Sequence, residues 1–146
     1  MKIFIYLSNF TKNLVEAWGK HLETDQQNKI NSSHLLFPEV AYDSSLNVYS
    51  HGAIALSGPE QSARIKKCLS DSNNVDNLVI ATHSEIIFSV LRCEIKAGRI
   101  TPDNFEVRWI NPNMEMITIE SMEDGRLVEW PTEMFSEYEK LLMELL

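Results

Sequence analysis

The stretch NLVIATHSEIIFSVLR, residues 77–92, decides the fold class of this chain. Its first five residues contain an unbroken run of aliphatic side chains, which is typical of a strand buried on both faces in a parallel sheet. An apolar pattern with helical spacing begins at Glu85 and continues to Gly98, a residue type that commonly ends a helix. The stretch therefore predicts a central parallel strand followed directly by a helix.

His83 lies between that strand and that helix. In open α/β sheets, ligands bind outside the carboxyl ends of the strands, and helix N-termini favour anions. Thr82 and Glu85 have the spacing of a capping box, so a structural role is sufficient to explain them. For His83 two interpretations remain open: contact with a phosphate, or an ordinary hydrogen bond at a strand end.

The rest of the chain continues the alternation of strands and helices. The sequence predicts further helices over residues 13–23, 59–72 and 132–146, and further strands over residues 2–8, 52–58, 105–110 and 114–121. Residues 24–50 are polar at first and then could hold one or two short strands. The last two strands alternate on either side of an NPN turn, as in a hairpin. We therefore expect an α/β fold with a partly parallel sheet and antiparallel edge strands.

Composition narrows the functional classes. The 146 residues are enough for one core, so we treat 1–146 as a single domain. The net charge of −8 argues against direct nucleic-acid binding, which draws on phosphate neutralisation. We see no run suited to a signal peptide or a membrane span, and expect a cytoplasmic protein without a membrane partner. Cys68 and Cys93 fall in apolar helical patterns, so we expect buried free thiols and no metal site.

Carboxylates are concentrated in the last part of the chain. From Glu115 onward there are nine acidic residues against two basic ones. A solvated face is one explanation. The other is a docking surface for a basic partner, with Glu133, Glu137 and Glu139 as candidate contact residues.

From about Gln61 to Leu142 the chain resembles the C-terminal part of a family of bacterial P-loop ATPases, the ABC-like, AAA-type proteins of the overcoming-lysogenization-defect kind. The resemblance is carried by LVIATHSE before a helix, GRITPD before a strand, DG at residues 124–125, and EWP followed by MF. In that family the histidine of THS senses the nucleotide γ-phosphate, a role that the resemblance assigns to His83. It implies a P-loop NTPase-like three-layer sandwich.

The phosphate-binding loop is missing where the resemblance places it. A P-loop has two glycines, a lysine and a Ser or Thr, because its backbone N–H groups must close on the phosphates. In YLSNFTKN the corresponding residues are Tyr6, Thr11, Lys12 and Asn13. Lys12 is either a vestige of the P-loop lysine or a solvated lysine near a helix start. We expect side chains such as Tyr6 and Phe10 to fill the phosphate pocket.

The acidic motif that holds Mg²⁺ and activates water is missing as well. The Walker B strand should end just before the helix over residues 59–72, where the sequence reads GAIALSG. Glu60 is the nearest carboxylate, and we expect it to serve the first turn of that helix. The chain is also much shorter than those ATPases, so we expect a truncated, reduced ATPase-like domain.

Three functional hypotheses remain. In the first, the chain is a non-catalytic, ATPase-like partner or regulator within a larger bacterial complex, by resemblance one of anti-phage defence or DNA processing. Its partner would be a full-length ATPase, an effector subunit or another copy of itself. In the second, His83 and Lys12 complete a composite ATP–Mg²⁺ site with another subunit; otherwise we expect no cofactor. The third is a fragment of a split gene without an independent role.

Overall fold

The structure, a computed structural model, describes residues 1–37, 49–50 and 57–146. Strands and helices alternate along most of the chain. In order they are β1 (Lys2–Ser8), α1 (Thr11–Gln27), β2 (Ser32–Phe37), β3 (Tyr49–Ser50), α2 (Gly58–Asp71), β4 (Asn77–Thr82), α3 (Glu85–Lys96), a 3₁₀ turn (Pro102–Asn104), β5 (Phe105–Ile110), β6 (Met116–Ile119) and α4 (Glu137–Leu145).

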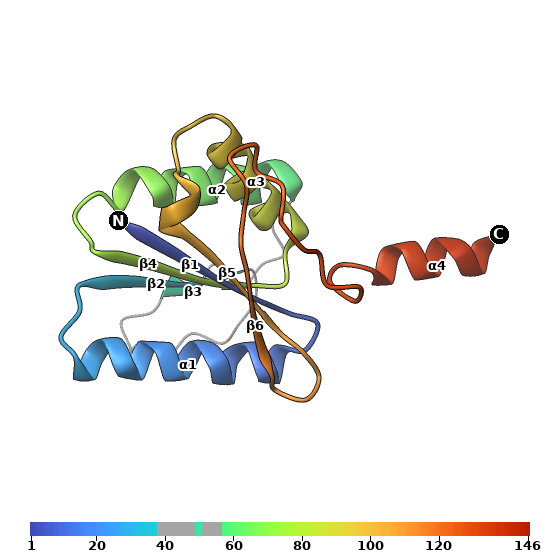
Figure 1. The fold of residues 1–146 in the computed structure, drawn as a ribbon, viewed down its shortest axis with the longest axis horizontal. Coiled ribbons are helices and arrows are strands. Elements are labelled where there is room, and N and C mark those ends of the chain that lie inside the picture. Colours follow the sequence, from blue (N-terminus) through green and yellow to red (C-terminus); the bar gives the residue numbers. More distant parts are fainter. Residues whose placement is uncertain (38–48, 51–56) are drawn as a thin grey trace.

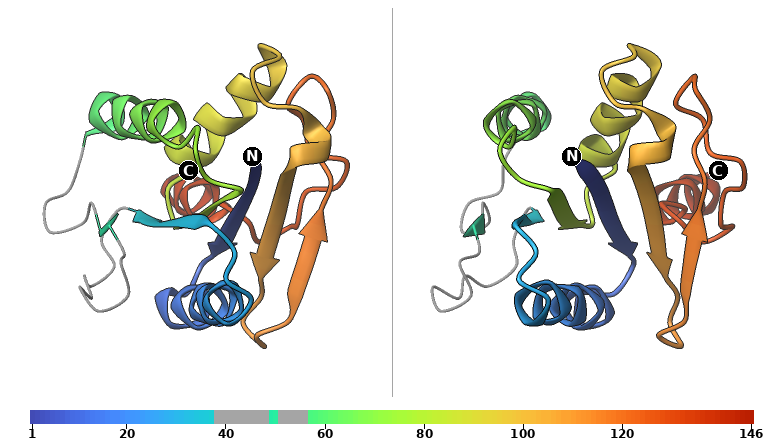
Figure 2. Two further views of the ribbon diagram at one scale, coloured as in Figure 1. Left: turned by 90° about the vertical axis from the view of Figure 1, so that its left-hand side faces the viewer. Right: turned by 60° about the vertical axis from the view of Figure 1, so that its left-hand side comes forward.

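The described strands form one sheet in the order β3-β2-β4-β1-β5-β6. All neighbours from β3 to β5 are parallel, and β6 is antiparallel to β5 at the edge. Helix α1 covers one face of the sheet, while α2 and α3 cover the other (Figures 1 and 2). The predicted α/β class, the partly parallel sheet and the antiparallel edge are therefore confirmed.

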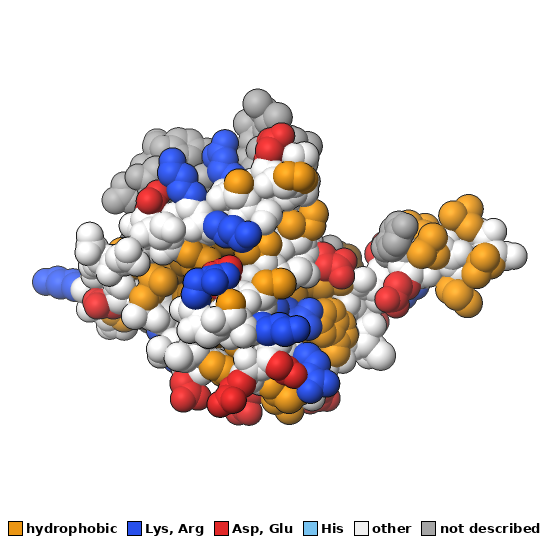
Figure 3. Space-filling model, turned by 90° about the horizontal axis from the view of Figure 1, so that it is seen from above, with side chains coloured by type: hydrophobic (Ala, Val, Ile, Leu, Met, Phe, Trp, Pro, Cys, Tyr) orange, Lys and Arg blue, Asp and Glu red, His pale blue; other side chains and the backbone are white. Residues whose placement is uncertain are grey.

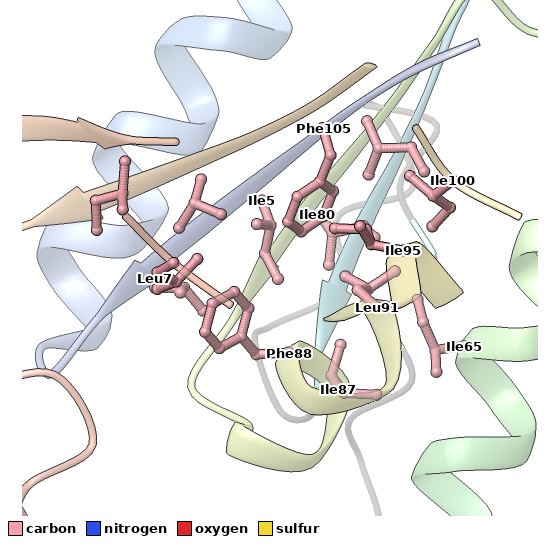
Figure 4. Close-up of a cluster of buried hydrophobic side chains, with 14 of the residues drawn as sticks. Ile5, Leu7, Ile65, Ile80, Ile87, Phe88, Leu91, Ile95, Ile100 and Phe105 are labelled. Atoms are coloured by element: carbon pink, nitrogen blue, oxygen red, sulfur yellow. The ribbon is translucent and has the colours of Figure 1, made fainter. Parts of the chain in front are cut away.

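The core explains why the strand of the NLVIATHSE stretch is so apolar. Residues 78–82 of β4 are all buried, because helices cover both faces of the sheet there. On one face Ile5, Leu7 and Ile80 belong to a cluster with the buried side of α3 (Figure 4). On the other face, Tyr6 and its neighbours pack against the apolar side of α1. Successive side chains of β1 therefore point to opposite faces of the sheet, as the two-residue period of a strand requires.

Several boundaries differ from the sequence predictions. Helix α1 continues to Gln27, beyond the predicted end at residue 23, and the chain turns at Lys29, which has a positive φ of 52°. Within residues 24–50, the described strands are β2 and β3. The strand predicted over 52–58 lies mostly outside the described residues, and Gly58 begins α2 with Pro59 in its first turn. Glu60 lies in that first turn, as predicted.

The helix predicted over 132–146 is wrong in its first part. Phe135 adopts a φ of 57°, which interrupts the helix, and its ring packs 5.9 Å from the ring of Phe88 on α3. This tertiary contact delays the helix until Glu137. Helix α4 then projects from the body of the molecule (Figure 1).

Both cysteines are free thiols, as predicted, but their burial differs. Cys68 is partly buried, and burial raises the pKa of its thiol. Cys93 is exposed on α3, so the prediction that it is buried is wrong. Its position on the helix faces away from the sheet. Of the helices that the structure describes, none combines the length and apolar character needed to cross a membrane.

Candidate functional site

The carboxyl ends of β1 and β4 form the switch point of the sheet. From β1 the chain passes through α1 to β2, on one side of the pair. From β4 it passes through α3, on the opposite face, to β5 on the other side. The strands end level with each other, since Leu7 pairs with Thr82. In open α/β sheets this crevice is where ligands bind.

His83 lies at this point, as the sequence predicts, and both of its ring nitrogens are bonded within the chain. Nδ1 lies 2.6 Å from the carbonyl oxygen of Ser8, which can only accept, so Nδ1 carries the proton. In the neutral ring Nε2 then accepts from the hydroxyl of Thr11, at 2.9 Å. The imidazole thus joins the end of β4 to the turn between β1 and α1.

That turn is too short to cradle a phosphate. Asn9 and Phe10 are the two residues that connect β1 to α1. The backbone N–H of Phe10 donates to the hydroxyl of Ser8, at 3.1 Å, and the Asn9 amide donates to the carbonyl oxygen of Glu133, at 3.0 Å. A P-loop needs several successive N–H groups directed at the ligand. Here the N–H of Phe10 and the side chain of Asn9 bond to the protein, and the first turn of α1 has no side-chain cap.

A hollow of about 370 Å³ opens beside His83. Glu85 at the start of α3 and Glu137 at the start of α4 both line it. Two carboxylates oppose a polyphosphate by like-charge repulsion. Lys12, on the first turn of α1, is exposed and does not line this hollow. The structure therefore brings Thr11, and not Lys12, to His83.

Two expectations for this corner are wrong. Thr82 is not the helix cap: Ser84 is the N-cap residue, and its hydroxyl accepts from the N–H of Ile87 at 3.2 Å. The strand continues through Thr82, whose hydroxyl accepts from the N–H of Ser84 at 2.8 Å. Tyr6 and Phe10 do not fill the corner either, since Tyr6 faces α1 and Phe10 is 50% exposed.

The predicted contact residues Glu133, Glu137 and Glu139 are spread along the tail. Glu133 supplies a backbone oxygen to Asn9, Glu137 borders the His83 hollow, and Glu139 lies on α4. All three are exposed, and their role as contact residues stays a prediction.

Helix α3 contacts the turn at residues 124–125 and the segment that contains Trp130. Arg92 of α3 donates through Nε to the carbonyl oxygen of Gly125, at 2.8 Å. Its guanidinium lies 5.3 Å from the centre of the Trp130 ring and 5.6 Å from that of Phe88. The turn at residues 124–125 and the segment around Trp130 are therefore both in contact with α3. Cation–π contact and the backbone hydrogen bond both contribute to this anchor.

A second polar group, which sequence analysis missed, lies between α1 and the sheet. Arg108 of β5 pairs with Glu106 and donates to the hydroxyl of Tyr6. That hydroxyl lies 2.7 Å from Nδ1 of His21, and Nε2 of His21 faces Asp25 at 3.4 Å. Donors and acceptors match along this chain if the His21 ring is neutral.

The network ends at a buried aspartate between two histidines. His34 of β2 donates through Nε2 to Asp25, at 3.0 Å, and its Nδ1 is buried without a partner in the described chain. Burial lowers the pKa of both His21 and His34, although the Asp25 carboxylate opposes the shift. A protonated His34 would place a second N–H where no described residue accepts it. Both rings are held neutral near neutral pH.

This network borders a hollow of about 520 Å³. Its polar edge includes Tyr6, His21 and Arg108, and its apolar lining includes Ile110 and Met114. Burial raises the pKa of Tyr6, so its hydroxyl stays protonated. Among the described residues, no three His, Cys, Asp or Glu side chains are grouped to hold a metal ion. The network therefore places polar side chains at the edge of a hollow with a partly apolar lining.

Sequence signals for this network were weak. His21 and Asp25 are four residues apart, but the predicted helix ended before Asp25. Tyr6 and Arg108 are brought together by the parallel register of β1 and β5, across 102 positions of sequence. No local pattern reports such a pairing.

Comparisons with protein-family models, curated protein sequences and solved structures gave no match to this chain.

Proposed function

We propose that this chain is a non-catalytic, ATPase-like subunit that binds another protein and does not turn over nucleotide. The observation that carries the proposal is the bonding of His83. Its ring nitrogens are satisfied by Ser8 and Thr11, at the position where a switch histidine would meet a γ-phosphate. To reach a ligand through Nε2, the ring would have to give up its bond to Thr11, which would cost about 0.5–1.5 kcal/mol before any contact is gained.

The surroundings of His83 support the same conclusion. The two-residue turn after β1 is shorter than a P-loop and lacks its glycines, and Glu85 and Glu137 place negative charge on the hollow. Phosphoryl transfer depends on positioning and on positive charge around the phosphates. The described side chains that line this hollow include no Lys or Arg. We therefore interpret the domain as a reduced, truncated P-loop NTPase-like sandwich whose nucleotide site has been replaced by internal hydrogen bonds.

A binding role is supported by α4. Its apolar side chains are unusually exposed, with Leu142 at 43%, Met143 at 71% and Leu145 at 83%. An exposed apolar patch of this kind commonly marks an interaction site. Glu137 and Glu139 add negative charge along the same helix. We propose that α4 binds a protein within a cytoplasmic bacterial complex, such as an ATPase of anti-phage defence or DNA processing.

The competing function is a composite nucleotide site shared with another subunit. Its support is the location of His83 at the strand ends where α/β sheets bind ligands. In that case another subunit would have to supply the phosphate cradle and the metal ligands.

Titration of the purified full chain with labelled ATP and Mg²⁺ separates the two functions. We expect no saturable binding up to millimolar nucleotide. Saturable binding that disappears in His83→Ala would overturn the non-catalytic proposal. The same ATP–Mg²⁺ titration in the presence of the neighbouring gene products tests the composite site, because a shared site would bind nucleotide only when both proteins are present.

The binding role has its own assay. Co-expression with the neighbouring gene products should give a complex that survives size-exclusion chromatography. Leu142→Glu should weaken that complex at least tenfold, whereas Lys20→Glu, on the exposed side of α1, should not. Equal complexes with wild type and Leu142→Glu would show that α4 is not the contact surface.

A further inference from the structure

A groove with an apolar floor runs between α2 and α3. Its volume is about 530 Å³. Ile86, Val90 and Cys93 of α3 line it, and Ile86 is 41% exposed. Lys66 of α2 and Arg99, just beyond α3, lie along its edges. Such a groove, apolar at the centre and charged at the rim, suits an amphipathic helix.

Charge is unevenly divided between this face and the tail. Residues 58–99 carry six of the 13 basic residues against five carboxylates, in a chain with a net charge of −8. Residues 115–146 carry two basic residues against nine carboxylates. Figure 3 shows Lys and Arg side chains spread over the α2–α3 face, with hydrophobic side chains between them. The formal net charge is therefore +1 over residues 58–99 and −7 over residues 115–146, so the first segment does not repel the tail through its net charge.

One carboxylate in the groove is already neutralised. Glu94 accepts two hydrogen bonds from Arg99, at 2.5 and 2.9 Å. Lys66 lies close enough to lower the pKa of Glu94 further, after the larger effect of Arg99. Glu94 is thus paired, whereas Glu85 at the start of α3 is a second carboxylate on the groove, so the acidic side chains of an incoming helix would face Lys66 and Arg99 rather than that end.

Helix α4 has the matching pattern. Leu141, Leu142 and Leu145 share one side of the helix at helical spacing, and all three are exposed. Glu137, Glu139 and Glu144 surround that side. Two acidic α4 helices would repel each other, so direct pairing of α4 with α4 is disfavoured.

Helix α4 is short enough to lie along the groove between α2 and α3. Nine helical residues span roughly 13 Å, whereas α2 and α3 span roughly 21 and 18 Å at 1.5 Å per residue. Because one copy carries both the helix and the groove, reciprocal docking gives a closed two-fold assembly.

We infer that α4 of one copy docks in the α2–α3 groove of a second copy, forming a reciprocal dimer. The inference names the partner of the α4 surface, and it rests on the protein-binding function proposed above. In this dimer each copy covers the apolar helix of the other.

Disulfide trapping tests the contact, because Cys93 lies in the groove and is exposed. In a Cys68→Ala background, Leu142→Cys should form a covalent dimer under mild oxidation. Removing Cys93 with Cys93→Ala should abolish it, and Lys140→Cys, on another side of α4, should give little dimer. A dimer that persists without Cys93 would overturn the inference.

Sedimentation of the full chain gives the second readout. Wild type should be dimeric at micromolar concentration, and Leu142→Glu or Ile86→Glu should each be monomeric with unchanged circular dichroism. A mixture of the two variants should recover heterodimer through its one intact contact.

If the wild type is monomeric and Leu142→Cys forms no disulfide-linked dimer, the inference that α4 binds a second copy is wrong. If Leu142→Glu then still weakens binding to a neighbouring gene product, the proposed function stands without the dimer. If it has no effect there either, both proposals fail.

Discussion

His83 holds two segments that are far apart in the sequence. Its ring is bonded to the carbonyl oxygen of Ser8 and to the hydroxyl of Thr11, and Thr11 is 72 positions from His83 in the sequence. Because both bonds are lost together, His83→Ala should lower the free energy of unfolding by about 1–2 kcal/mol, measured by urea denaturation. Thr11→Val, which removes one bond, should cost about half as much. If His83→Ala leaves the free energy of unfolding unchanged, the bonds of the ring do not stabilise the fold.

The buried histidines predict a dependence of stability on pH. Burial lowers the pKa of His34 in the folded protein, so below about pH 6.5 the unfolded chain binds more protons than the folded one. The stability that follows from a neutral His34 is therefore present above that pH and is lost as the pH falls.

Unfolding in urea at about pH 7.5 and about pH 5.5 checks this sign. His34→Gln removes the titrating ring and keeps a donor for Asp25. The variant should be less stable than wild type at the higher pH, and the gap should narrow at the lower pH. A gap that widens on acidification would contradict the neutral-histidine assignment.

At the scale of residues, sequence could locate His83 but not its partners. The strand-to-helix boundary in NLVIATHSE places a histidine at the carboxyl end of a buried strand. Its bond to Thr11 depends on the register of β1 against β4, which no local pattern encodes. The same holds for Tyr6 and Arg108, which meet through the register of β1 and β5.

At the scale of elements, the tail depends on a close approach at Gly125. It has a φ of 81°, and a Cβ there would lie 2.3 Å from the carbonyl oxygen of Arg92. Gly125→Ala should therefore destabilise the protein by about 3 kcal/mol or more. Gly98→Ala is the matched control, since Gly98 has a φ of 77° but open space around it. It should cost about 1 kcal/mol. Urea denaturation measures both variants. If Gly125→Ala and Gly98→Ala lose the same free energy of unfolding, the backbone at Gly125 does not lie in tight contact with α3.

Elements with long, regular patterns were predictable, and those set by tertiary contacts were not. The strand β4 and helix α3 follow from residues 77–98, because burial on both faces demands a continuous apolar run. The start of α4 could not be found in the same way. Phe135 leaves the helical pattern to pack against Phe88, and its φ of 57° reflects that packing.

At the scale of the whole molecule, α4 projects from the body of the protein, and we propose that it serves assembly and not folding. Its leucines are exposed, so Leu142→Glu should change the free energy of unfolding of dilute, monomeric protein by less than about 0.5 kcal/mol. Leu91→Ala, in the fully buried core, should cost about 2–5 kcal/mol. Urea denaturation measures both. A large loss for Leu142→Glu would mean that α4 packs on its own chain.

The central claim is that internal hydrogen bonds have replaced the phosphate contact of His83. Long-range ¹H–¹⁵N spectra of the histidine rings test it most directly, with His83→Gln used to assign the signals. The structure predicts that His83 carries its proton on Nδ1 and that its ring signals do not move when Mg²⁺ and millimolar ATP are added. A proton on Nε2, or a saturable shift of the His83 nitrogens with ATP, would contradict the claim.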